Sequence, residues 1–279
     1  MTLSLKKELS EDSLVTQQRL GVLSKKGTIP VKTVTNPLNP PPQSKMDELV
    51  SLYGSGDLSG VVMKGSSLAK DYPGSTVLWN ILGAAYSGLK EWPSAEAAFS
   101  RAIEVNPRYP DAHNNLGILY RGQGRMDEAL ESFRHAVELK PDYLQAQFNL
   151  GNILRDLGEF DAAIQSFEKA ITINPKFGEI FAALGTTFLL DRKFEKAVSN
   201  YDRAISLIPS SPELHNNMGN ALFGMGQLEG AVSSFRRAIG LKSTYAEAYF
   251  NLATALKDLE QYEEAIENYR TAVRLKPQY

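Results

Sequence analysis

The stretch that decides the fold is residues 110–143, PDAHNNLGILYRGQGRMDEALESFRHAVELKPDY, because residues 144–177 repeat its pattern as LQAQFNLGNILRDLGEFDAAIQSFEKAITINPKF. Both stretches have a Leu-Gly pair at their seventh and eighth positions and a phenylalanine at their twenty-fourth. A fixed period of this length is typical of repeat architectures. Extending the 34-residue period in both directions gives six consecutive segments, 76–109, 110–143, 144–177, 178–211, 212–245 and 246–279.

The pattern within each segment predicts two antiparallel helices. Apolar residues recur three and four apart, a turn such as Gly122-Gln123-Gly124 follows, and a second run has the same spacing. Small residues at positions 8, 20 and 27 allow close approach of the helices, and a proline ends the second helix in five of the six segments. One such hairpin cannot bury both of its faces, so successive hairpins are expected to stack.

The first segment carries a recognisable signature. It reads Trp79-x2-Leu82-Gly83-x2-Tyr86, followed by Ala95-x3-Phe99 and by Pro107. This pattern resembles that of the tetratricopeptide repeat family. The resemblance implies an all-α fold, a right-handed superhelix (α-solenoid) of six 34-residue repeats plus one degenerate N-terminal repeat, with a concave inner face.

The two ends of the chain depart from the repeat. Residues 46–75 look like a decayed copy without the Leu-Gly pair, which predicts a degenerate capping repeat. Residues 1–45 contain the proline-rich run at 37–43 and are predicted to be a disordered tail and linker, with a short amphipathic helix near residues 9–23 as the alternative. The last repeat stops at Tyr279 without a capping helix, so either the chain is a piece of a longer protein or another molecule covers that end.

Composition excludes several classes of function. The chain of 279 residues has no cysteine, three histidines and a net charge of -2, so neither a thiolate site nor an overall basic surface for nucleic acid is expected. No apolar run of about 20 residues and no signal-peptide core occur, which predicts a cytoplasmic protein without a membrane partner. No catalytic or nucleotide-binding motif is present, so we expect a non-enzyme without cofactor or metal.

The candidate binding residues follow from the family resemblance. In such arrays, positions 2, 5, 6, 9, 12 and 13 of the first helix of each repeat point into the groove. Here positions 5, 6 and 9 are rich in asparagine, a mediocre helix former whose amide can pair with the C=O and N–H of an extended peptide. The pattern is similar to the asparagine ladder of O-GlcNAc transferase. These candidate peptide-binding asparagines are Asn80, Asn114, Asn115, Asn149, Asn152, Asn216, Asn217, Asn220 and Asn251.

The same asparagines have a structural alternative, in which their amides bond between neighbouring repeats and set the pitch of the superhelix. Arg121, Arg155 and Lys257 at position 12 are further candidates, which would add charge selectivity to a peptide groove. The fourth repeat breaks the polar series with apolar residues that could anchor one partner side chain. The members of this apolar set are Ala182, Ala183, Leu189 and Leu190, with Phe148, Phe223 and Phe250 at nearby groove positions.

Two other kinds of site are disfavoured. Tetratricopeptide domains that clamp a C-terminal carboxylate use a lysine at position 5, and no repeat here has one. His113 and His215 occupy position 4, where other repeats carry aromatic residues, so we expect them to pack rather than to bind a ligand, and His135 is expected on the surface.

Three functions remain open at this point. The first is a non-catalytic scaffold that binds an extended segment of a protein partner in its groove. The second is a substrate-recognition or dimerisation arm of a larger enzyme, because the linker and repeats look like bacterial arrays that precede a sulfotransferase or glycosyltransferase domain. The third is a homo-oligomer that assembles through the uncapped C-terminal repeat.

Overall fold

The computed structural model describes residues 40–278. In this range the helices are joined by turns and no strand occurs, which confirms the prediction of an all-α fold. The helix considered for residues 9–23, and the predicted tail up to residue 39, lie outside the described residues. In the linker, Pro40–42 are not helical, and the first described helix begins at Gln43 rather than at the predicted boundary of residue 46. Pro42 occupies its N-cap, where a proline gives up no helical hydrogen bond.

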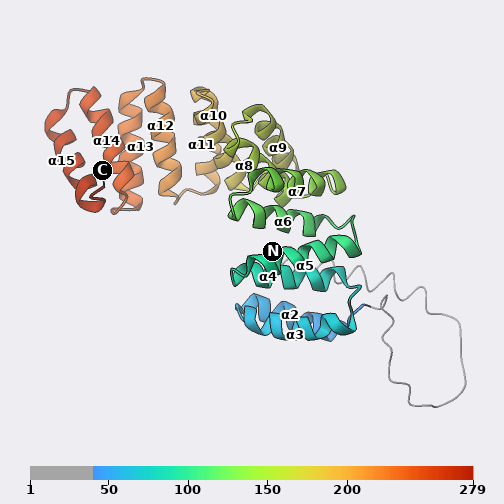
Figure 1. The fold of residues 1–279 in the computed structure, drawn as a ribbon. Helices are drawn as coiled ribbons and strands as arrows, with labels where there is room; N and C mark the ends of the chain where they lie inside the picture. The colour runs from blue at the N-terminus through green and yellow to red at the C-terminus, as the bar shows by residue number, and fades with distance from the viewer. Residues whose placement is uncertain (1–39, 279) are drawn as a thin grey trace, which may run out of the picture. The chain divides into compact units, whose positions relative to one another are not determined.

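The chain divides between Leu139 and Lys140 into two compact units (Figure 1). The unit that ends at Leu139 contains three helix pairs. They are α2 (Gln43–Ser55) with α3 (Leu58–Asp71), α4 (Thr76–Gly88) with α5 (Trp92–Val105), and α6 (Pro110–Gly122) with α7 (Met126–Leu139).

The unit that begins at Lys140 contains four helix pairs. They are α8 (Leu144–Asp156) with α9 (Phe160–Ile173), α10 (Gly178–Leu190) with α11 (Phe194–Leu207), α12 (Pro212–Gly224) with α13 (Leu228–Leu241), and α14 (Ala246–Asp258) with α15 (Tyr262–Leu275). Each pair from α4 onward occupies one of the 34-residue segments.

Within a pair, close packing depends on the small residue at position 8. A Cβ atom added at Gly117 would lie 2.7 Å from the ring of Phe133, and one added at Gly151 would lie 2.6 Å from the ring of Phe167. Both rings are fully buried. The aromatic side chain at position 24 of the second helix therefore rests directly on the backbone of the first helix, which explains why the two positions recur together.

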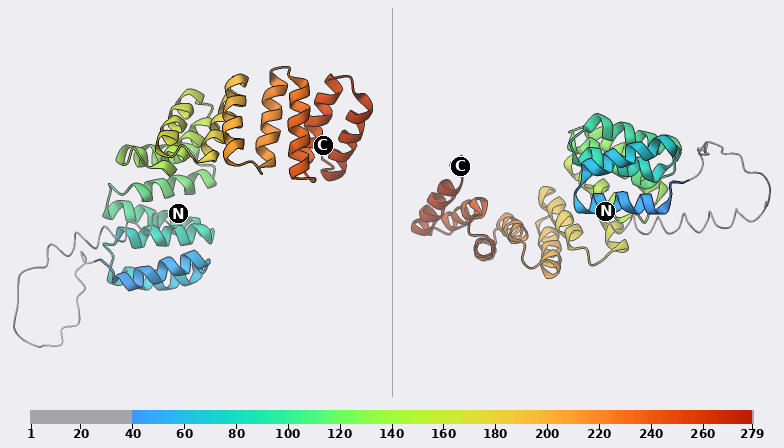
Figure 2. Two further views of the ribbon diagram at one scale, coloured as in Figure 1. Left: turned by 180° about the vertical axis from the view of Figure 1, so that it is seen from behind. Right: turned by 90° about the horizontal axis from the view of Figure 1, so that it is seen from below.

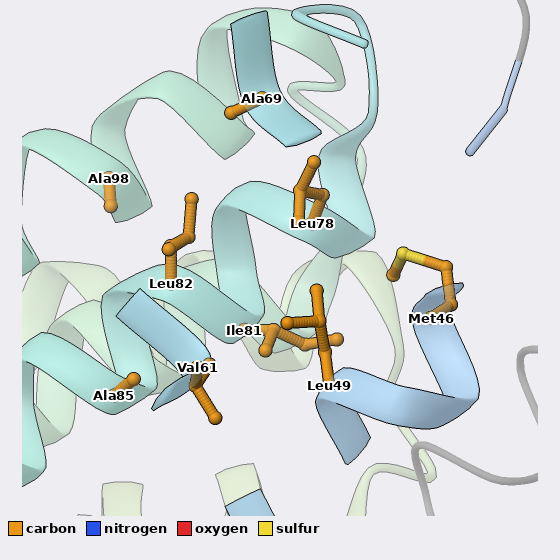
Figure 3. Close-up of a cluster of buried hydrophobic side chains, with 9 residues drawn as sticks. All are labelled: Met46, Leu49, Val61, Ala69, Leu78, Ile81, Leu82, Ala85 and Ala98. Carbon is orange, nitrogen blue, oxygen red and sulfur yellow. The ribbon is translucent and has the colours of Figure 1, made fainter. Parts of the chain in front are cut away.

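The first described pair, α2 and α3, packs onto α4 through a shared apolar cluster (Figure 3). Met46 and Leu49 from α2 and Val61 from α3 are buried against Leu78 and Leu82 of α4. Gly65 of α3 lies where a Cβ would come within 2.8 Å of the Leu82 side chain. Helices α2 and α3 thus form a hairpin that packs on α4, and the capping role predicted for residues 46–75 stays a prediction.

The contacts between pairs put the first helices on one side of each unit. In the first unit α2 contacts α4 and α4 contacts α6, and in the second unit α8, α10, α12 and α14 contact one another in sequence. Second helices touch the first helix of the following pair, but within each described unit no two second helices touch each other. Figure 2 shows the pairs of each unit side by side. The first helices therefore line the inner side of each stack.

Candidate functional site

All twelve candidate binding residues lie on first helices, which contact one another in sequence within each unit. Their exposure differs. Five asparagines are buried, six residues are partly exposed, and one is fully exposed. In that order they are Asn80, Asn114, Asn115, Asn152 and Asn216, then Asn149, Asn217, Asn220, Asn251, Arg121 and Arg155, then Lys257.

Two pairs of these asparagines bond to each other between successive repeats. Asn115 Nδ2 on α6 donates to Asn80 Oδ1 on α4 at 2.9 Å. Asn251 Nδ2 on α14 donates to Asn216 Oδ1 on α12 at 3.0 Å. In both pairs, position 6 of one repeat reaches position 5 of the repeat before it, 35 residues earlier. This is the inter-repeat role that the sequence left open as an alternative to peptide binding.

The paired asparagines belong to longer chains of hydrogen bonds. Asn216 is completely buried, and its Nδ2 donates to Glu247 Oε1 of α14 at 3.3 Å. Asn114 Nδ2 lies 3.5 Å from Asn115 Oδ1, at the long limit of a hydrogen bond. Buried amides keep such partners because an unsatisfied amide in the interior is unfavourable by roughly 1–3 kcal/mol.

Asn217 differs from Asn115 and Asn251, although all three occupy position 6. The residue 35 places before Asn217 is Ala182, which has no acceptor to offer. Within residues 40–278 the side chain of Asn217 makes no hydrogen bond, and the same holds for Asn220 on the same helix. The one buried side-chain nitrogen or oxygen of the described residues without a partner belongs to His215, so the amides of Asn217 and Asn220 reach solvent.

Two of the three candidate basic residues lie close to an acidic neighbour. Arg155 Nη2 lies 2.8 Å from Asp156 Oδ1, and Lys257 Nζ lies 3.5 Å from Asp258 Oδ1. Arg121 is partly exposed in the last turn of α6. Cations in the last turn of a helix are stabilised by its dipole, so these residues have a local structural role besides any contact with a ligand.

The predicted apolar set is only partly available on the surface. Leu190 is 54 % exposed and Phe250 is 42 % exposed, whereas Ala183 is buried. Phe148 is occupied by ring contacts with Phe167 and Phe177, at centroid distances of 5.9 and 5.7 Å. Phe223 packs against the buried cluster formed by α13, α14 and α15. Leu190 is therefore the apolar residue of this set most accessible to a ligand, and Leu189 and Ala182 on the same helix are partly exposed.

Position 4 has a function that the sequence analysis missed. Trp79 Nε1 donates to the carbonyl of Pro73 at 2.9 Å, and Gln147 Nε2 donates to the carbonyl of Pro141 at 3.0 Å. His113 Nε2 lies 3.0 Å from the carbonyl oxygen of Pro107. In each case a side-chain N–H satisfies the carbonyl of the proline six residues earlier. The recurrence of N–H-bearing side chains six residues after a proline was the available signal.

The histidines of these positions have perturbed pKa values. Burial lowers the pKa of His113; the Pro107 carbonyl opposes this shift, and nearby His135 adds to it. The rings of His113 and His135 stack at a centroid distance of 5.5 Å. Burial also lowers the pKa of His215, whose Nε2 is buried beside Pro209 without a hydrogen bond of good geometry. These surroundings match packing positions, and His135 is exposed.

Two further findings concern the part of the chain that the structure describes. No cluster of three or more His, Asp or Glu side chains there could hold a metal ion. None of its helices combines the length and the hydrophobicity needed to cross a membrane.

Comparisons with known proteins identify the repeat. A family model described as tetratricopeptide repeat matches residues 74–142 and 108–176, and another with this description matches residues 246–279. A model described as TPR repeat matches residues 193–226 and 219–259. No curated protein matches the sequence. The resemblance to arrays that precede a sulfotransferase or glycosyltransferase, and to O-GlcNAc transferase, therefore stays a prediction.

Solved structures share the fold. YrrB, reported as a TPR protein with an unusual peptide-binding site, is 26% identical, covers 66% of this chain and 95% of its own, and has a TM-score of 0.56. PilF of Pseudomonas aeruginosa is 20% identical over 73% of this chain and 93% of its own, with a TM-score of 0.63. MamA is 21% identical over 58% of this chain and 95% of its own, with a TM-score of 0.55. Because the family models together match most of the chain and the helix pairs keep the same 34-residue period, this chain belongs to the tetratricopeptide repeat family.

Proposed function

We propose that this chain is a non-catalytic protein-interaction scaffold that binds an extended segment of a partner protein along its first helices. Tetratricopeptide repeats support the role of an interaction scaffold, and the extended peptide and the asparagine contacts are our inference. Stacked repeats present a long continuous surface, which suits a segment that lies across several hairpins.

The observation that carries the proposal is the concentration of carboxamides on the inner side of the stacks. Positions 5, 6 and 9 supply nine asparagines, and several, among them Asn217, Asn220 and Asn251, remain partly exposed. A carboxamide offers a donor and an acceptor, as a peptide group does, so such a surface can bind a main chain with little regard to its side chains. Leu190 and the basic residues at position 12 would then add selectivity.

The similarity to YrrB supports the same proposal, since that protein is reported to have a peptide-binding site on a tetratricopeptide array. Its binding residues are not carried over to this chain. The proposal rests on the residues of this chain and on their placement.

The test is a titration of candidate partner peptides against two double variants, Asn115→Ala/Asn149→Ala and Asn217→Ala/Asn251→Ala. Loss of hydrogen bonds to the peptide main chain is expected to weaken binding about tenfold or more in at least one of the two variants, since each lost bond corresponds to roughly 1 kcal/mol. Asn200→Ala is the matched control, because Asn200 lies on the second helix α11 and donates to its own helix, to Lys196 O. Unchanged affinity in both double variants would refute the role of the asparagines.

A second candidate function is self-assembly through α15, and a specific observation favours it. Tyr262 is 54 % exposed, Ile266 49 % and Val273 45 %. On α13 the corresponding residues Leu228, Val232 and Ile239 are buried or partly buried under α14. The exposed face of α15 therefore has the apolar chemistry of an inter-repeat contact, and a second copy could cover it.

A further inference from the structure

The hydrogen bonds between asparagines follow a rule that can be stated from the described pairs. Where an asparagine at position 6 lies 35 residues after an asparagine at position 5 of the same unit, the two bond, as Asn115 does with Asn80 and Asn251 does with Asn216. In each case the Nδ2 group of position 6 is directed to the preceding first helix. One donor of that amide is then already used inside the protein.

Asn217 is the exception in the second unit. Its counterpart on α10 is Ala182, so the rule leaves its Nδ2 without an acceptor. Asn217 is partly exposed, and no side chain of the described residues bonds to it. Asn220 follows one turn later on the same face of α12, and its amide is equally unengaged. Asn152 on α8 also lacks a hydrogen bond but is only 7% exposed, which leaves little area for a ligand.

The helix beside these two amides offers apolar rather than charged groups. Helix α10 contacts α12, and its Ala182 and Leu189 are seven residues apart and share one face. Leu190 at its end is 54 % exposed. The phenol of Tyr201, which approaches α10 from α11, is buried and donates to Thr186 Oγ1 at 3.0 Å. No charged side chain occurs between Ala182 and Leu190.

We propose that Asn217, with Asn220, is the main contact point for the main chain of a bound extended peptide, and that the α10 side of this point accepts an uncharged, preferably apolar, side chain. This inference rests on the proposed function and assigns different roles to asparagines that look equivalent in the sequence. Asn115 and Asn251 are positioning residues that hold successive repeats together.

The physical reason is the state of each amide before a ligand arrives. One of the two Nδ2 hydrogens of Asn251 already bonds to Asn216, so a peptide can use only the second hydrogen and the oxygen of this amide. The amide of Asn217 exchanges only water for peptide. Asn217 can therefore offer its oxygen and both hydrogens in the orientation that the ligand requires, whereas the bond to Asn216 holds the Asn251 amide in one orientation.

The decisive variant is Ala182→Asn, which places an acceptor where Asn80 and Asn216 have theirs and should engage the Asn217 amide internally. Ala182→Ser is the matched control, since its side chain is polar but too short to form this bond. The probe is the tightest binder from a library of acetylated and amidated decapeptides with uncharged side chains, titrated against the full chain. Side-chain amide signals of ¹⁵N-labelled asparagines report which residues contact the probe.

With the unchanged chain, the probe is expected to shift the amide signals of Asn217 and Asn220 more than those of Asn115 and Asn251. Ala182→Asn should slow hydrogen exchange at the Asn217 amide, raise the thermal unfolding midpoint and weaken probe binding about tenfold. Ala182→Ser should bind the probe as the unchanged chain does. Asn217→Ala/Asn220→Ala, made in the chain with Ala182 unchanged, should weaken probe binding by at least as much as Ala182→Asn does.

Three results would overturn the inference. Unchanged affinity in Asn217→Ala/Asn220→Ala, or in an Ala182→Asn chain whose Asn217 amide has become protected, would show that the peptide does not use this amide. Probe binding that is lost instead in Asn115→Ala or Asn251→Ala chains that remain folded would move the contact point and leave the proposed function intact. Absence of binding by any library peptide to the unchanged chain would refute both proposals.

Discussion

At the scale of single residues, position 4 shows how different side chains solve one local problem. The proline that ends a second helix leaves its carbonyl near the start of the next first helix. Trp79, His113 and Gln147 each place a ring or amide nitrogen about 3 Å from that oxygen. Because a carbonyl oxygen can only accept, His113 must carry its hydrogen on Nε2 in this arrangement. A neutral imidazole is sufficient for the contact.

This contact predicts a pH dependence of stability. The pKa of His113 is lowered in the folded chain, mainly by burial, so the unfolded chain binds a proton more readily. The stabilising contribution is therefore complete above the unfolded pKa of about 6.5 and is lost as pH falls through the lower folded pKa. The thermal midpoint should drop between pH 7.5 and 5.5, and His113→Gln should reduce that drop.

The control for this prediction is built into the chain. Gln147 makes the same kind of bond at the same position, so His113→Gln should keep the contact without the titration. His215 also has a lowered pKa, so His113→Gln/His215→Gln should flatten the profile further. An unchanged pH profile in the double variant would show that these histidines do not cause it.

The candidate site could be predicted from the sequence only as a set of positions. Asparagine recurs at positions 5, 6 and 9 of the first helices, and two pairs of these asparagines bond between neighbouring first helices. The pairing of these amides depends on contacts between repeats. An alignment of equivalent positions at the 34-residue period therefore does not show which asparagines bond to each other. The relevant spacing is 35 residues, from position 5 to position 6 of the next repeat.

At the scale of elements, the backbone conformation of the turn within each hairpin explains why glycine recurs between the two helices. One residue of the turn takes a positive φ, and it is glycine at Gly124, Gly158 and Gly226. The same position is Lys90, Arg192 or Glu260 in the other three repeats, with φ of 62°, 58° and 62°. A residue with a Cβ in this conformation is unfavourable by roughly 1–2 kcal/mol, because its Cβ approaches the following carbonyl oxygen.

Lys90→Gly is therefore expected to stabilise the first unit. The gain from relieving the left-handed conformation is partly offset by the greater flexibility of glycine in the unfolded chain, about 0.5–1 kcal/mol, so the net gain is at most about 1.5 kcal/mol. The Lys90 side chain is exposed and makes no hydrogen bond or ion pair that would be lost. Urea unfolding measures the change, with Gly124→Lys as the reverse substitution, expected to be destabilising by a similar amount. A lower midpoint for Lys90→Gly would contradict the explanation.

At the scale of the whole molecule, the repeat period predicted the helices well but did not predict the division between Leu139 and Lys140. The period continues without insertion through this point, and the small, aromatic and proline positions are all occupied on both sides of it. The residues at those positions determine the packing and the ends of the helices within each hairpin. They therefore carry no signal for a division of the chain into two units.

The exposed face of α15 leads to the last prediction, on self-association. Ile266, 49 % exposed, is flanked on α15 by Tyr262 and Val273, and burial of such side chains against another molecule contributes about 25 cal/mol per Å². The full chain, with a monomer mass of 30.8 kDa, is expected to show a concentration-dependent increase in mass in light scattering after size-exclusion chromatography. Ile266→Lys should shift it to the monomer. Met63→Lys is the control, because Met63 is 68 % exposed on α3, in the other unit, and its replacement should leave association unchanged. The monomer mass at every concentration of the unchanged chain, or equal loss of association in both variants, would rule out α15 as the contact surface.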